Sequence, residues 1–276
     1  MGWIFDDNNG WYASGSGTGI ALGCLRFSYD PQWACVPFGT LIVVYNEHEK
    51  DPLIPADDLT DANGDDVFIL PGNSTFFERN NSIPNTSNGS YVGLTFNSPP
   101  LWFSAIMRNG GDSFQTIDPN DLTSAFHAFS WGNNDSFPQV YFNSSFSGMV
   151  AIFHHAVSND LRNNLNWSLI PIAGFQTPGA ANNFNNQVWI NSMKGVFTGS
   201  TWTWNGSVNN NWFEPCNWDR FSVPQLTSDV VIPGNTTHQP MIQTDSAFCK
   251  SLTNYVVNNG HLTIDWLSGG VLIKQP

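Results

Sequence analysis

An acidic turn in the first quarter of the chain has the residue types and spacing of a metal-binding loop. Asp61, Asn63 and Asp65 place side-chain oxygens at alternate positions, and Asp66 follows directly with a further carboxylate. Calcium-binding loops supply oxygen ligands in this alternating way. The full EF-hand order is not met, because Asp66 stands where that loop has glycine and no glutamate follows at its twelfth position. The turn predicts either a calcium site, with calcium as the one cofactor, or a solvated acidic loop.

Four tryptophans lie close together in the last third of the chain, at Trp202, Trp204, Trp212 and Trp218. Aromatic faces pack well against apolar surfaces, and the C–H faces of sugars are such surfaces. The same side chains could instead fill a small module whose core is short of bulk. The cluster is therefore either a glycan-stacking platform or a structural core.

The four cysteines form two local pairs in sequence, Cys24 with Cys35 and Cys216 with Cys249. Neither pair has the close C-x-x-C spacing of a zinc site or a thioredoxin-like motif. An even count with one pair in each apparent module predicts two disulfides, formed within these pairs, in an oxidising compartment. The alternative is four buried thiols in a cytosolic protein.

Motifs of catalysis are absent from the sequence. The chain has no G-x-S-x-G elbow, no H-E-x-x-H, no phosphate loop and no dinucleotide fingerprint. The chain has only four glutamates, which argues against the buried acid/base pair of a glycosidase. We therefore expect a protein that is not an enzyme.

The charge balance limits the classes of partner. Nine Lys and Arg stand against 22 Asp and Glu, a net charge of −13. A nucleic-acid binder needs cations to neutralise phosphates, and anionic lipid headgroups attract cations in the same way. No stretch approaches the roughly 18 apolar residues of a membrane span. We expect neither a nucleic-acid partner nor membrane insertion.

The elements that must position these residues read as short strands. Gly, Pro, Asn and β-branched residues recur at the 8- to 12-residue spacing typical of sandwiches and barrels, and helix signals are nearly absent. The run 40–45 (TLIVVY) is apolar on both faces and predicts a central strand. Strands are expected at 19–29, 40–46, 67–71, 101–107, 113–117, 125–130, 140–142, 149–154, 229–232, 251–257, 261–264 and 271–274.

Composition divides the chain into two modules. Residues 176–183 (QTPGAANN) are small residues and turn formers that cannot propagate a sheet, so the first β domain is expected to cover 1–183. Residues 184–195 are expected to be a linker, followed by a Trp-rich β module over 196–276. The last three strands of this module are either successive hairpin arms or the first rungs of a β-solenoid.

An ordered set of motifs runs through the first module. These motifs lie at residues 2–10 (GWIFDDNNG), 15–23, 26–27, 33, 37–46, 111–116, 130–134 and 177–182. Together they resemble the lamin tail domain, in the form found in secreted and cell-surface proteins of Bacteroidetes, over about residues 1–190. Residues 204–264 resemble the β-rich modules that follow such domains.

The resemblance implies an immunoglobulin-like β-sandwich, a non-catalytic role and export, by type IX secretion, to the cell surface. Family members begin with one or two strands before the Gly-Trp, and we expect this chain to lack them. A sheet without its first strand has an open edge that a neighbouring chain can extend.

The expected function is that of a structural or adhesive module in a secreted bacterial surface or filament protein. It would act by protein–protein contacts, including strand complementation, with other copies of itself or with other surface proteins. The alternative is a carbohydrate-binding module of a larger secreted enzyme, with glycans as partners.

Overall fold

The computed structural model describes residues 2–6, 24–45, 50–80, 91–97, 111–132, 139–145, 147–155, 158, 160–171, 176–195, 200–243, 246–254, 263–264 and 270–273. They form two compact units. Unit 1 comprises Met1–Trp33 and Leu41–Gln187, and unit 2 comprises Ala34–Thr40 and Val188–Pro276. The chain thus passes between the units three times. The sequence predicted a first domain over 1–183 and a linker over 184–195, and it did not indicate the inserted segment 34–40.

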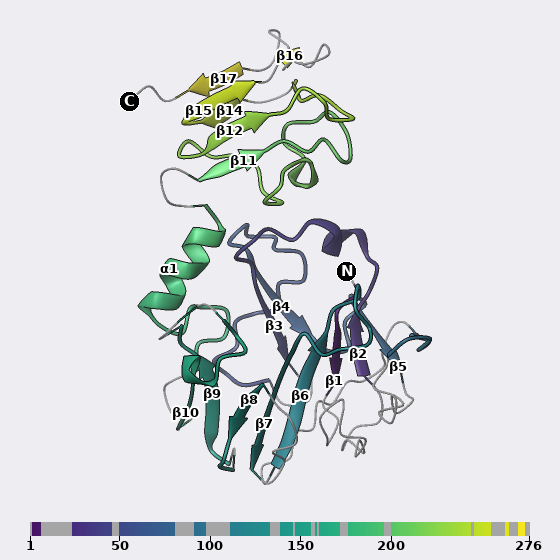
Figure 1. The fold of residues 1–276 in the computed structure, drawn as a ribbon, viewed down its shortest axis with the longest axis vertical. Coiled ribbons are helices and arrows are strands. Elements are labelled where there is room, and N and C mark those ends of the chain that lie inside the picture. Colours follow the sequence, from purple (N-terminus) through teal and green to yellow (C-terminus); the bar gives the residue numbers. More distant parts are fainter. Residues whose placement is uncertain are drawn as a thin grey trace. The chain divides into compact units, whose positions relative to one another are not determined.

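Unit 1 is built on one six-stranded sheet (Figure 1). The strand order is β5-β2-β1-β6-β7-β8, antiparallel throughout except for the parallel pair β7–β8. The strands are β1 (Ile4–Asp6), β2 (Cys24–Phe27), β5 (Phe77–Asn80), β6 (Gly111–Ile117), β7 (His127–Gly132) and β8 (Val140–Phe142). The all-β class predicted from the sequence is confirmed.

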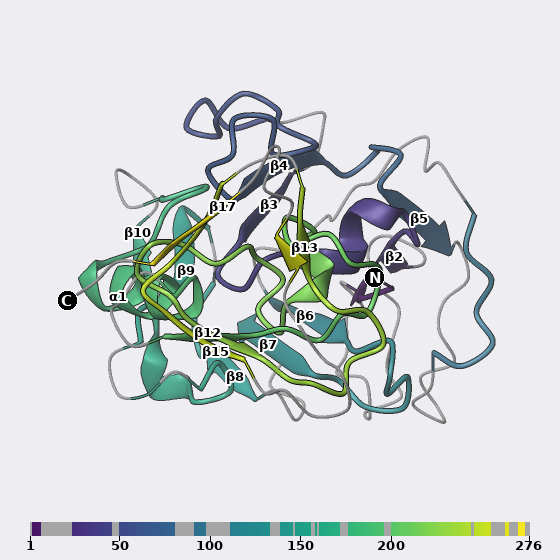
Figure 2. The same ribbon diagram turned by 90° about the horizontal axis from the view of Figure 1, so that it is seen from above.

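Two smaller sheets complete unit 1. Strand β3 (Leu41–Tyr45) runs parallel to β4 (Val67–Pro71), and β9 (Met149–Phe153) runs antiparallel to β10 (Trp167–Pro171). Figure 2 shows both pairs to one side of the six-stranded sheet. Of the sequence-predicted strands, 101–107 lies outside the described residues.

Aromatic side chains join the small sheets to the large one. Trp33 lies between Phe27 of β2 and Phe68 of β4, with ring centroids 4.7 and 5.4 Å away. Phe129 of β7 stacks on Trp167 of β10 at 6.2 Å. Because side chains alternate between the faces of a strand, these rings project from one face of the large sheet and bury the core there.

Strand β3 has one strand neighbour among the described residues, whereas its apolar sequence predicts a central strand with two. It pairs with β4, and no second strand pairs with it in the described part of the chain. Most of its residues are half-buried, and Val44 is 38% exposed. An apolar run predicts a strand whose two faces are shielded from water. It does not specify which segments pair with the two edges of that strand.

Unit 2 contains a β-solenoid arrangement, as the second of the two sequence interpretations proposed. Its strands pair in parallel as β11 (Thr201–Thr203), β12 (Asp229–Ile232) and β15 (Ser251–Asn254), as β13 (Met241–Ile242) with β16 (Thr263–Ile264), and as β14 (Ser246–Cys249) with β17 (Gly270–Ile273). Asp229 pairs with Ser251 and Met241 with Thr263, each 22 residues apart, whereas the spacing is 24 residues between β14 and β17 and 28 residues between β11 and β12. Parallel pairing excludes hairpin arms, whose strands would be antiparallel.

The expected linker at 184–195 is instead a helix, α1 (Phe184–Met193). The segment lacks Gly and Pro within the helix, and the Asn183 side chain accepts a hydrogen bond from the Asn186 amide at 3.0 Å, as a helix N-cap does. The helix was not predicted because the segment is rich in asparagine, which favours helix caps over helix interiors. No helix among the described residues is long and apolar enough to span a membrane.

Candidate functional site

The four tryptophans are the core of unit 2. Trp202, Trp204, Trp212 and Trp218 are each at most 1% exposed and cluster with Val230, Ile232, Ile242, Ala247 and Cys249. Buried ring faces cannot stack on a sugar, so the glycan-platform interpretation is wrong and the structural one is correct. The sequence pattern of large apolar side chains in a small module is explained by core filling.

These tryptophans also use their polar atoms locally. Trp218 packs edge-on against Trp204 and Trp212, with ring centroids 5.0 and 4.8 Å away. The Trp204 indole N–H donates to the His238 carbonyl at 2.7 Å, and the Trp218 indole N–H donates to the Trp212 carbonyl at 2.9 Å. These two bonds satisfy the indole N–H groups of Trp204 and Trp218 and fix the orientations of their rings.

The outer edge of β11 is covered by the residues that follow Trp218. The Asp219 carboxylate accepts the Thr203 amide at 2.9 Å, and the Asp219 amide donates to the Thr203 carbonyl at 3.0 Å. Arg220 Nε donates to the Thr201 carbonyl at 3.0 Å. The first solenoid strand therefore has a strand on one side and a capping loop on the other, which protects it from pairing with another chain.

Arg220 ties this cap to the end of helix α1. Its guanidinium donates to the carbonyls of Ser192 and Met193, at 3.4 and 3.3 Å, in the last turn of the helix. It also lies over the Trp202 ring, 4.9 Å from the centroid. A cation at a helix C-terminus satisfies carbonyls that lack an intrahelical partner. No sequence pattern indicates this role, since Arg220 stands apart from other arginines.

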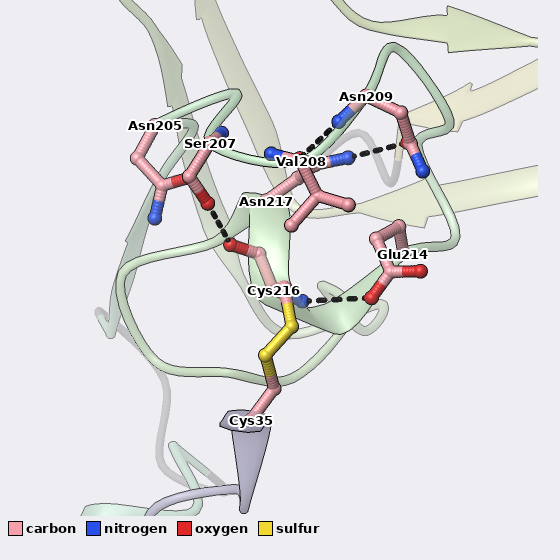
Figure 3. Close-up of a disulfide and its surroundings, with 8 residues drawn as sticks. All are labelled: Cys35, Asn205, Ser207, Val208, Asn209, Glu214, Cys216 and Asn217. Atoms are coloured by element: carbon pink, nitrogen blue, oxygen red, sulfur yellow. Dashed lines mark hydrogen bonds between the residues drawn. A yellow bond between two sulfur atoms is a disulfide. The ribbon is translucent and has the colours of Figure 1, made fainter. Parts of the chain in front are cut away.

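A fully buried asparagine organises the loop that carries Cys216 (Figure 3). The Asn217 side-chain oxygen accepts the amides of Val208 and Asn209, at 3.0 and 3.2 Å. Its side-chain nitrogen donates to the Asn209 side chain and to the Asn211 carbonyl, at 2.9 and 3.0 Å. All four bonds of this amide hold the loop's own backbone or side chains, so the loop has one preferred shape.

Unit 1 contains the same loop at Asn166. That buried side chain accepts the Ser158 amide at 3.1 Å and donates to the Asp160 carbonyl at 2.9 Å. In both loops a tryptophan follows the asparagine, at Trp167 and at Trp218, and its indole N–H donates to the carbonyl six residues back. The shared Asn-Trp dipeptide, each time after a short 3-10 turn, is the sequence signal that could have indicated this element.

The cysteine pairing predicted from sequence is wrong. Cys35 forms a disulfide with Cys216, with their Cα atoms 5.3 Å apart (Figure 3). Cys24 and Cys249 are buried and do not form disulfides. A disulfide requires Cα atoms within about 7 Å, a distance that the fold sets and sequence spacing does not. Burial, followed by the charge of Asp229, raises the pKa of the Cys249 thiol and keeps it protonated and unreactive.

The disulfide fixes the inserted segment Ala34–Thr40 within unit 2. The Phe38 amide donates to the Arg220 carbonyl at 3.4 Å, and the Phe38 ring packs edge-on against Phe221 at 5.6 Å. Gly39 has φ +89°, and a Cβ there would lie 2.9 Å from the Ile190 carbonyl oxygen, so the segment needs glycine at this point. We call this segment the strap.

The acidic turn uses its oxygens for its own backbone. Asp61 Oδ1 accepts the Asp65 amide at 3.0 Å, and Asn63 Oδ1 accepts the same amide at 3.0 Å. Asp65 Oδ1 accepts the Val67 amide at 2.9 Å. Among the residues that the structure describes, no three His, Cys, Asp or Glu side chains come together to hold a metal ion. Turn formation explains the alternating spacing of these side chains.

The charges of the turn repel one another. Burial raises the pKa of Asp61, and the carboxylates of Asp66 and Asp65 add to the rise, while the two backbone amides oppose it. At Asp57, burial is outweighed by hydrogen bonds from Lys50 and Tyr45 and by the Lys50 charge, so the pKa lies below its usual value. The pKa of Asp61 is thus raised by burial and by neighbouring negative charge, and that of Asp57 is lowered by its pairing with Lys50 and Tyr45.

Unit 1 also buries a polar network that the sequence did not indicate. The Tyr91 hydroxyl donates to the Asp6 carboxylate at 2.5 Å and accepts the Gln115 side-chain N–H at 2.5 Å. Burial, together with the Asp6 charge and bond, raises the pKa of Tyr91 well above its usual value. The hydroxyl therefore stays protonated and holds β1 and β6 to the segment 91–97.

Residues 203–272 match a family model described as "Domain of unknown function (DUF8693)". The match covers most of the capping loop, the Trp core and the solenoid strands of unit 2, and ends within β17. No curated protein and no solved structure matches the chain.

Proposed function

We propose that the chain is a non-catalytic structural or adhesive module of a secreted surface protein. It acts by protein–protein contacts in which an exposed strand edge of unit 1 takes up an extended segment of a neighbouring molecule. The resemblance of unit 1 to lamin tail domains supports the class, and the Cys35–Cys216 disulfide supports an oxidising compartment outside the cell.

The edge of β3 carries the proposal. The Leu41 amide donates to the Asp66 carbonyl and the Tyr45 carbonyl accepts the Gly72 amide, so these residues direct their backbone groups toward β4. Backbone groups alternate in direction along a strand, so Ile42 and Val44 direct theirs away from β4. Among the described residues no strand lies on this side of β3, and an apolar strand with such an edge can take part in β-augmentation.

The same edge defines the chemistry of the partner. Added strands gain affinity from main-chain hydrogen bonds and specificity from alternate side chains. A segment with apolar residues at alternate positions fits beside the Leu-Ile-Val-Val-Tyr sequence of β3. A second copy of this chain and another surface protein are both sources of such a segment.

Amide hydrogen exchange on the isolated chain tests the edge directly. We expect the Ile42 and Val44 amides to exchange fast and the Val43 amide to be protected by β4. When the chain is concentrated or mixed with a peptide of the β3 sequence, Ile42 and Val44 should become protected. Val44→Pro removes one outward N–H and should abolish that gain, whereas Thr75→Pro, on an exposed turn, should not. Protection of Ile42 and Val44 in the dilute monomer would overturn the proposal.

A further inference from the structure

The Cys35–Cys216 disulfide closes a very long loop. The two cysteines are 181 residues apart in sequence. Strands β3 to β10, helix α1 and strand β11 all lie between them. Strands β1 and β2 precede Cys35, and the solenoid strands from β12 onward follow Cys216.

We propose that this disulfide is a tension bypass. When force is applied to the chain before Cys35 and after Cys216, it passes from Cys35 to Cys216 through the covalent bridge. Residues 36–215 then carry none of this force. Those residues include most of unit 1, with the β3 edge. The use of the bypass under tension rests on the proposed role as a surface module, whereas the bypass itself does not.

The bridge is anchored on the unit 2 side by a rigid loop (Figure 3). The Cys216 amide donates to the Glu214 carboxylate at 3.2 Å, and the Ser207 hydroxyl donates to the Cys216 carbonyl at 2.6 Å. The next residue is the fully buried Asn217, with its four hydrogen bonds. Force that arrives at Cys216 is therefore delivered to an element whose backbone is fixed.

On the other side, the bridge holds the strap. Cys35 ends the 3-10 turn η1 (Pro31–Cys35) and lies within the strap, whose Phe38 packs on Phe221. Without the bond, the strap is held in unit 2 by the Phe38 amide bond, the Phe38–Phe221 contact and the packing at Gly39. These are non-covalent contacts of a seven-residue segment, so the disulfide decides whether the strap stays attached under tension.

Reduction of the disulfide lets the segment between the two cysteines extend under force. A thiolate of a dithiol reductant attacks one sulfur and displaces the other cysteine as a thiolate; the second thiol of the reductant then closes a cyclic disulfide. Two electrons pass from the dithiol to the bridge, and the protein gains two thiols. The released segment 36–215 joins two cysteines that are 181 positions apart, and it extends by about 60–65 nm at the length of a stretched chain.

Single-molecule stretching with handles at both ends of the full chain tests this. The oxidised chain should reach a final extension about 60–65 nm shorter than the C35S/C216S variant. Adding dithiothreitol while the oxidised chain is held under force should produce one further step of that length. The matched control, C24S/C249S, changes the two other cysteines and should keep the short extension and the dithiothreitol step.

Extension counts residues and does not depend on stability, so a variant that folds poorly still reports the full length. Equal final extensions of the oxidised chain and C35S/C216S would overturn the bypass, and so would loss of the step in C24S/C249S. Failure of the proposed strand uptake would leave both extensions unchanged, so the two results are separable.

Discussion

Asp219 occupies the outer edge of β11 by bonding Thr203 twice, through its carboxylate at 2.9 Å and through its amide at 3.0 Å. This is the pair of bonds that an added strand would make with Thr203. The first solenoid strand is therefore closed to other chains, in contrast to β3 of unit 1, whose outer side has no strand partner among the described residues.

The capping bond predicts the effect of changing Asp219. Asp219→Ala should lower the free energy of unfolding of unit 2 by about 1–2 kcal/mol, because the Thr203 amide loses a charged acceptor. Asp219→Asn keeps an acceptor at this position and should lose less than half as much. Denaturant unfolding followed by tryptophan fluorescence measures both, and equal losses in the two variants would contradict the capping role.

The buried Asn217 predicts a larger loss. Asn217→Ala leaves the Val208 amide and the Asn211 carbonyl without their partner and opens a cavity beside Trp218. We expect about 3 kcal/mol or more of lost stability, since each unsatisfied buried group costs about 1–3 kcal/mol. Asn235→Ala, on an exposed turn of the same unit, should change stability by less than about 0.5 kcal/mol. Similar midpoints for the two variants would refute the organising role of Asn217.

The disulfide should stabilise unit 2. Loss of the bond in C35S/C216S should reduce the free energy of unfolding by about 2–4 kcal/mol, because the unfolded chain regains the entropy of an open loop. C24S alone should leave the bridge intact. Peptide mapping without reductant checks the pairing itself, and recovery of a peptide that joins Cys24 to Cys35 would contradict the structure.

His127 predicts a pH dependence in unit 1. Burial lowers the pKa of His127 below its usual value of 6.5, more than its bond to the Leu161 carbonyl raises it, while the charges of Arg162 and Asp160 act in opposite directions. Below about pH 6.5 the unfolded state therefore binds a proton that the folded state does not, and stability falls until the folded pKa is passed. Unfolding of unit 1 should become easier from pH 7.5 to 5.5.

The variant His127→Phe separates this titration from packing. A phenyl ring can keep the stacking on Trp167, where the centroids are 5.5 Å apart, but it takes up no proton. Thermal unfolding at the two pH values should show a smaller pH effect in this variant than in the parent chain. An unchanged pH effect would assign it to another group.

Calcium is expected to leave the melting midpoint of unit 1 unchanged. The side-chain oxygens of Asp61, Asn63 and Asp65 already accept backbone amides of the turn, so a bound ion would have to displace these bonds. Differential scanning calorimetry with millimolar calcium and with a chelator measures the difference. A midpoint that rises with calcium and falls with the chelator would restore the calcium site.

The sequence by itself determined the features that depend on local composition. Regularly spaced turn residues and β-branched runs indicated an all-β chain. The large apolar area of the four tryptophans has to be buried in a core because the module is small, and these are Trp202, Trp204, Trp212 and Trp218. The alternating oxygens of the acidic turn followed from backbone amides a few residues away. The amides that the acidic turn binds lie close to it in sequence. The tryptophans require only apolar neighbours, whichever residues supply them.

Only the tertiary structure decided which distant segments meet. Cys35 and Cys216 became partners because residues 34–40 lie within unit 2, and no spacing rule reaches across 181 residues. The same holds for Arg220 at the end of α1 and for the pairing of β3 with β4, because the apolar sequence of β3 fits a neighbour without specifying one. Pairing across a fold depends on distance in space, which a single sequence does not encode locally.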